Sequence, residues 1–187
     1  MGLLGAEQRR EAVAAGGARW GALELETAVT AADSIAGMVR TPEEWAAHPQ
    51  SAAVDGLPLF DITRIGDSDP EPLPAGDRPL AGIRAVDVTR VIAGPMCGRT
   101  LAEHGAEVLM VTAPHLPQIA EHVMDTSHGK RSCYLDLPQP DDAATLKRPA
   151  AETDVFTHGS LPGPIPKLGF RPATPADAAA PRAHAAS

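Results

Sequence analysis

Two short apolar segments separated by a helix-like stretch constrain the fold most. Ile83–Thr89 and Glu107–Thr112 are rich in aliphatic residues and threonine, a composition that favours β-strands. Met96–His104 between them predicts a helix, and Gly105 is placed to end it. Strands joined through a helix run parallel and form a right-handed crossover. The sequence therefore predicts a strand–loop–helix–strand unit over residues 79–112.

The loop Arg90–Gly98 (RVIAGPMCG) follows the first of these strands. Ligands of open parallel sheets bind beyond the carboxyl ends of the strands, which is where this loop lies. Its glycines let the backbone approach a ligand closely, and the next helix presents free N–H groups that favour phosphate. Arg90 adds further donors. We therefore expect a phosphate-bearing cofactor here; a tight turn without a ligand is the alternative, because GxGxxG and Walker A motifs are both missing.

A classical NAD site is not expected. The second strand runs into Thr112-Ala113-Pro114 and lacks the acidic residue that would hold a ribose.

Further strands are predicted at Ser132–Leu137 and Asp154–Thr157, with a helix at Asp141–Glu152 between them. The fold class is thus α/β, with a Rossmann-like partial parallel sheet over residues ~80–170. The Ala/Pro-rich tail, residues 171–187, shows no periodicity and is expected to be disordered.

Residues 1–65 are expected to form a small separate α/β unit. A helix is predicted over residues 5–33 with a break at Gly16-Gly17, and Thr41 begins a second helix with a capping box. Short strands are predicted at Ser34–Arg40 and Leu57–Ile65. The proline-rich stretch over residues 66–79 is expected to be a linker.

Composition excludes several classes of function. The net charge of −8 argues against nucleic acid as a partner, since phosphate backbones are bound by clustered Lys and Arg. No apolar run is long enough to cross a membrane, so the expected location is the cytoplasm. The two cysteines give neither a disulfide framework nor a metal-binding spacing. For Lys130-Arg131, a functional role and a solvated turn are equally favoured.

The segment over residues 79–95, PLAGIRAVDVTRVIAGP, resembles the opening of the family III CoA-transferases of the CaiB/BaiF type. This family includes formyl-CoA and carnitine CoA-transferases and α-methylacyl-CoA racemase. Further similar blocks follow in family order and near family spacing, up to residue 170. They lie at residues 101–108, 129–132, 135–137, 154–156, 162–163 and 167–170. Residues 20–55 are similar to the family's small-domain element.

The resemblance implies coenzyme A as ligand, with an acyl-CoA or free CoA as partner, and carries over four groups of contacts. They are Arg90, Val91, Ile92 and Ala93; Leu135, Asp136, Leu137 and Pro138; Gly159, Ser160 and Leu161; and Lys167. Two departures from the family pattern occur. Ala113 and Pro114 stand where the family often has a basic residue, and Gly159-Ser160 replaces the usual Asn/aromatic pair.

The resemblance also implies transfer of CoA between an acyl-CoA and a carboxylic acid. Family transferases use an aspartate that attacks the thioester, and it lies beyond the last block matched here. No residue of this sequence corresponds to it, so no catalytic residue and no metal are assigned, and Asp87 is expected to be structural. We expect the nucleotide-binding part of a transferase, inactive alone and able to form a homodimer. The alternatives are a CoA-binding module or subunit that pairs with a complete transferase chain, and a remnant without a stable fold. The acyl donor and acceptor, and the choice between transferase and racemase, stay open.

Overall fold

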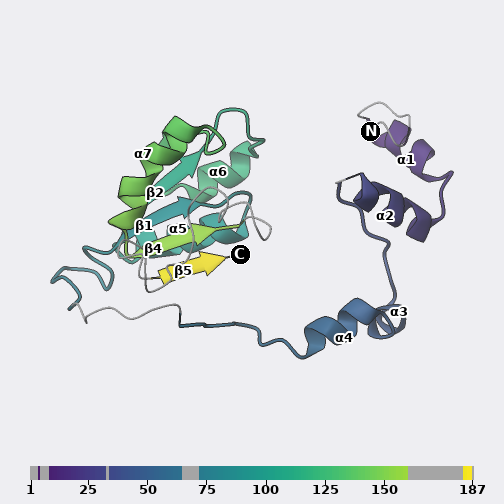
Figure 1. The fold of residues 1–187 in the computed structure, drawn as a ribbon, viewed down its shortest axis with the longest axis horizontal. Coiled ribbons are helices and arrows are strands. Elements are labelled where there is room, and N and C mark those ends of the chain that lie inside the picture. The colour runs from purple at the N-terminus through teal and green to yellow at the C-terminus, as the bar shows by residue number, and fades with distance from the viewer. Residues whose placement is uncertain (1–3, 5–8, 33, 65–71, 160–182, 187) are drawn as a thin grey trace. The chain divides into compact units, whose positions relative to one another are not determined.

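The computed structural model describes residues 4, 9–32, 34–64, 72–159 and 183–186 (Figure 1). The chain divides into two compact units, Met1–Ile62 and Thr63–Ser187. The helices of the first unit are α1 Arg10–Gly17, α2 Ala22–Ala31, α3 Pro42–Ala46 and α4 Pro49–Asp55. Those of the second unit are α5 Ala93–Glu103, α6 Ala120–Thr126 and α7 Pro140–Ala151. Its strands are β1 Arg84–Val88, β2 Glu107–Thr112, β3 Lys130–Tyr134, β4 Val155–His158 and β5 Ala183–Ala186.

The second unit is built on one parallel sheet with the strand order β3-β2-β1-β4-β5. The first strand along the sequence, β1, lies at the centre, with β2 on one side and β4 on the other (Figure 1). Helices connect β1 to β2, β2 to β3 and β3 to β4. The α/β prediction with a Rossmann-like parallel sheet is therefore confirmed.

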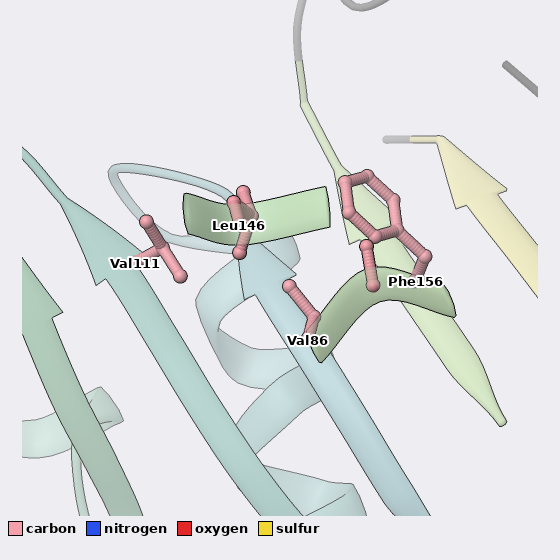
Figure 2. Packing of buried hydrophobic residues seen from close by; sticks show 5 residues of the cluster. Val86, Val111, Leu146 and Phe156 are labelled. Carbon is pink, nitrogen blue, oxygen red and sulfur yellow. The ribbon is translucent and has the colours of Figure 1, made fainter. Parts of the chain in front are cut away.

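Alternating residues of β1 divide the core into two layers, because successive side chains of a strand point to opposite faces. Val86 packs with Val111, Leu146, Ala150 and Phe156, so that α7 covers this face (Figure 2). Ala85 and Val108 pack instead with Ala102 near the end of α5 and with Ala106 just beyond the helix. The most deeply buried residues of this face are small, and larger side chains such as Leu101 pack around them.

Helix α5 begins at Ala93, three residues before its predicted start at Met96. Pro95 is tolerated in the first turn, because N–H groups there have no partner within the helix. Gly94 and Gly98 bring the helix against β1: a Cβ at Gly94 would collide with the Thr89 side chain. The predicted end is confirmed, with Gly105 in the left-handed region at φ 105°.

Other boundaries differ modestly from expectation. Strand β2 has its predicted bounds, whereas β3 begins at Lys130 and ends at Tyr134, earlier than the predicted Ser132–Leu137. Helix α6 was not predicted. Residues 171–182 of the predicted disordered tail, and residue 187, lie outside the described residues. Ala183–Ala186 pair with β4 as the edge strand β5.

In the first unit, the helix break near Gly17 and the capping box are confirmed. The Thr41 side chain accepts from the Glu44 N–H, and the Glu44 carboxylate accepts from the Thr41 N–H. Helix α4 was not predicted; it starts with Pro49 at its first position. Described residues of this unit form no strand, so the strands predicted at Ser34–Arg40 and Leu57–Ile65 are wrong as far as residue 64.

The physical reason is the lack of a strand for these segments to pair with. The Met38 N–H instead donates to the carboxylate of Glu26 on α2 at 2.6 Å, and Arg40 pairs with the same carboxylate at 2.7 Å. Leu59 and Ile62 are 90% and 94% exposed, so the apolar pattern there does not mark a buried element. Across the described part of the chain, no helix has the length and apolar character needed to cross a membrane.

Candidate functional site

The carboxyl ends of the parallel strands bring most of the predicted ligand contacts to one edge of the sheet. They are Arg90, Val91, Ile92 and Ala93 after β1, Leu135, Asp136, Leu137 and Pro138 after β3, and Gly159 after β4. Ser160, Leu161 and Lys167 lie outside the described residues. Since β1, β3 and β4 all run in the same direction, these segments share an edge although they are far apart in the sequence.

The loop after β1 has an unusual backbone. Val91 has φ 71°, a region that β-branched residues rarely adopt. Val91 and Ile92 are 57% and 50% exposed, so this turn is open to solvent. No side chain caps α5, which starts directly after Ile92. The loop therefore offers exposed apolar side chains beside the free N–H groups of a helix start.

Arg90 connects this loop with the segment that follows β2. The Nη2 group of its exposed guanidinium donates to the Pro117 carbonyl at 2.9 Å. An arginine carries five donors, so several stay available to a ligand at the same edge. Arg90 as a phosphate contact stays a prediction.

A network of buried polar groups lies directly beneath the loop. The Lys130 Nζ is 2.8 Å from Asp87 Oδ2, and their side chains are 0% and 1% exposed. Asp87 Oδ1 accepts from the Thr89 N–H at 3.0 Å, from the Thr89 hydroxyl, and from the Thr157 hydroxyl at 3.2 Å. Lys130 also donates to the Pro95 carbonyl at 2.7 Å. The structural role expected of Asp87 agrees with these contacts, whereas a solvated turn is wrong for Lys130.

A pocket of about 180 Å³ opens beside the loop, between the ends of β1 and β2 and helix α6. Arg90 and Val91 line it, together with residues that the sequence did not single out as ligand contacts, among them Thr112, Gln118, Ile119 and Val123. The Gln118 side-chain amide donates to the Thr112 hydroxyl at 3.1 Å. The signal that was missed is positional: residues 113–119 follow a central strand, as the loop after β1 does.

The predicted contacts after β3 divide by burial. Leu135 and Leu137 pack against the core cluster under α7, so their side chains support the fold. The backbone here is fixed, since the Leu135 N–H donates to the Thr112 carbonyl at 2.8 Å and the Asp136 N–H donates to Asp142 Oδ2 at 2.7 Å. Only Pro138 in this group is exposed, and the other three residues are half-buried. A ligand beside the segment Leu135–Pro138 would therefore contact its backbone and Pro138 rather than the two leucine side chains.

Within the described ranges, no three His, Cys, Asp or Glu side chains gather so as to hold a metal ion. His115 Nε2 lies 3.9 Å from Asp136 Oδ1 near the same edge, as an isolated pair. The site therefore consists of backbone donors, one arginine and apolar surface. Such a set can bind an anionic and partly apolar ligand.

Known proteins share both the sequence pattern and this fold. The chain is 39% identical over 93 residues to an acetyl-coenzyme A transferase, nodX, of Hypoxylon pulicicidum, covering 50% of this chain and 16% of that protein. It is 35% identical over 104 residues to the beta subunit of a succinyl-CoA–L-malate CoA-transferase of Chloroflexus aurantiacus, covering 49% and 26%. A mutant of Rv3272 from Mycobacterium tuberculosis is a solved structure with 31% identity and TM-score 0.51, covering 58% and 32%.

The chain thus spans well under a third of the length of the first two relatives. The model of one family, CoA-transferase family III, matches residues 80–182, more than half of the chain. The matched segment begins just before β1 and contains the whole edge at which the loop, the small pocket and the wall after β3 meet. The chain belongs to CoA-transferase family III.

Proposed function

We propose that the carboxyl edge of this sheet binds coenzyme A or an acyl-CoA. The observation that carries the proposal is the loop Arg90–Ile92: it turns through a positive φ at Val91 directly into the uncapped start of α5. This puts free helix N–H groups and an arginine beside the central strand, where a phosphate is favoured. Family membership supplies the reason to choose CoA among phosphate-bearing ligands.

Each group at this edge has a distinct part in the proposal. The free donors of Arg90 bind a phosphate oxygen, while the exposed side chains of Val91 and Ile92 offer apolar surface to the nucleotide. Gly159 and the backbone of Leu135–Pro138 form the remaining described walls. Ser160, Leu161 and Lys167 complete the proposed contacts on sequence grounds.

The activity proposed for the whole protein is transfer of CoA between an acyl-CoA and a carboxylic acid. A carboxylate nucleophile would attack the thioester carbonyl, releasing CoA as thiolate and leaving a mixed anhydride. The family resemblance assigns that nucleophile to no residue of this sequence. We therefore expect the chain to bind CoA without transferring acyl groups on its own.

A second proposal is that the chain acts as a subunit beside a complete transferase chain. The observation in its favour is that the Chloroflexus relative is named as the beta subunit of its enzyme. Co-expression with a complete family III transferase tests it: a stable mixed complex that survives size-exclusion chromatography supports pairing. Exclusive recovery of separate species would contradict it.

Calorimetric titration with CoA tests the binding proposal. Arg90→Ala should weaken affinity by about tenfold, the effect of losing one charge-assisted hydrogen bond worth roughly 1.5 kcal/mol. Arg99→Ala is the matched control, because Arg99 pairs with Asp125 on α6 and lines neither loop nor pocket. If the unchanged chain gives neither heat nor a rise in melting temperature with CoA, the proposal is wrong. A hydroxamate formed by the chain with acetyl-CoA and hydroxylamine would contradict its expected inactivity.

A further inference from the structure

The buried pair of Lys130 and Asp87 contacts the backbone on both sides of the open loop. On the near side, Asp87 Oδ1 accepts from the Thr89 N–H at 3.0 Å and from the Thr89 hydroxyl. On the far side, the Lys130 Nζ donates to the carbonyl of Pro95 in the first turn of α5 at 2.7 Å. The exposed residues between these two attachments are the loop itself.

From these contacts we propose that Lys130 and Asp87 are positioning residues: together they hold the loop between Thr89 and Pro95 in its CoA-binding conformation. The proposal rests on the proposed function and adds two residues that do not touch the ligand. Both lie under the loop, fully buried, on strands β3 and β1. Their effect on the ligand would pass through the backbone of Arg90, Val91 and Ile92.

The conformation of Val91 is the reason that the loop needs holding. A β-branched residue at φ 71° is strained, and a free loop would relax to negative φ. Such strain persists only where the surrounding structure determines the backbone on both sides. Within the loop, the Arg90 guanidinium donates to the Pro117 carbonyl at 2.9 Å. The two buried attachments are therefore the contacts best placed to maintain the turn.

Helix α5 packs closely against this pair at Gly98. A Cβ added at Gly98 would lie 2.9 Å from the Lys130 Nζ and would collide with Asp87 Oδ2. Gly94 similarly lies against Thr89. The helix start is thus pressed onto the buried pair, so that a shift of either charged group is transmitted to the loop.

A purely stabilising role is the competing explanation, and a set of three variants separates the two. Lys130→Met and Asp87→Asn each leave one buried charge without its partner, which lowers stability sharply. The double variant leaves no buried charge and should be more stable than either single variant. It still lacks the Lys130 bond to Pro95, so the far side of the loop stays unattached.

Two measurements are made on each folded variant: CoA affinity by calorimetry, and the strong intraresidue HN–Hα NOE that a positive φ gives at Val91. Positioning predicts that the double variant binds CoA at least about tenfold more weakly, the effect of lowering the binding-competent population to a tenth. The Val91 NOE should weaken in the same variant. Arg131→Met, at the exposed neighbour of Lys130, is the control and should change neither.

Recovery of both CoA affinity and the Val91 NOE in the more stable double variant would overturn the proposal, because stability alone would then explain the single variants. The NOE needs no ligand, so it also separates the two proposals of binding and positioning. If the unchanged chain does not bind CoA, the proposed function fails. The positioning of the loop is then supported by loss of the NOE in the double variant and contradicted by its retention.

Discussion

The Lys130 Nζ lies 2.8 Å from Asp87 Oδ2 in the middle of the second unit, and neither side chain is exposed beyond 1%. The pair joins β3 to β1 although β2 lies between them in the sheet. The Lys130 side chain can reach Asp87 because Gly98 of α5 has no side chain to occupy the space between them. A buried ion needs a counter-charge and hydrogen-bond partners in the protein, since water no longer solvates it.

Removing one member of this pair should destabilise the second unit strongly. Asp87→Asn leaves the Lys130 ammonium buried without a counter-charge and is expected to lower the free energy of unfolding by about 3–5 kcal/mol. Urea unfolding followed by circular dichroism measures the change. Asp125→Asn breaks the exposed Arg99–Asp125 pair and serves as control, with an expected effect below about 1 kcal/mol. Equal effects for the two variants would contradict this account of the buried pair.

A methyl group at Gly98 should act through the same contact. Gly98→Ala pushes α5 away from the Asp87 carboxylate and the Lys130 ammonium. Overpacking of this kind is expected to lower the free energy of unfolding by about 1–3 kcal/mol, despite the better helix propensity of alanine. Gly37→Ala is the control, because a Cβ there meets no atom within 4 Å. A Gly98→Ala protein as stable as the unchanged chain would show that α5 can move freely.

The sequence predicted those parts of the fold and the site that depend on residues close together along the chain. The β1–α5–β2 unit follows from local apolar periodicity and was predicted with every boundary within three residues. The Lys130–Asp87 pair was not, because 43 residues separate its members in the sequence and no pattern links them. The apolar pattern at Leu57–Ile65 led to a wrong strand prediction, because a strand also needs a second strand to pair with. Backbone strain at Val91 had no signal, because valine is uncommon at positive φ.

The α7 face of the core depends on Leu146. Its side chain is 0% exposed and packs with Val86 and Phe156 (Figure 2). Leu146→Ala should therefore lower the free energy of unfolding by about 2–5 kcal/mol, through lost burial and the cavity left behind. Leu23→Ala on α2 is the control, because Leu23 is 58% exposed and its loss should matter by less than about 0.5 kcal/mol. A small effect at Leu146 would mean that α7 does not cover this face.

The two cysteines should differ in reactivity. Cys97 on α5 is exposed, whereas Cys133 on β3 is half-buried, and this burial raises the pKa of its thiol. A raised pKa means a smaller fraction of the reactive thiolate at any pH below it. Labelling with iodoacetamide at pH 8, followed by peptide mass spectrometry, should modify Cys97 first. Faster labelling of Cys133 in the folded chain would show that β3 opens more readily than its pairing with β2 implies.

The Glu26 carboxylate joins α2 to the segment after it, and its titration reports that contact. The hydrogen bond from Arg40, followed by that from the Met38 N–H, lowers the pKa of Glu26 from 4.5 to about 2. Because the folded pKa is the lower one, the contact stabilises this unit above pH 4.5, and the contribution is lost as the pH falls towards 2. An NMR titration of the Glu26 side-chain carboxyl should find the low value, and Arg40→Met should move it back towards 4.5. A Glu26 pKa unchanged by Arg40→Met would show that the pair does not form in solution.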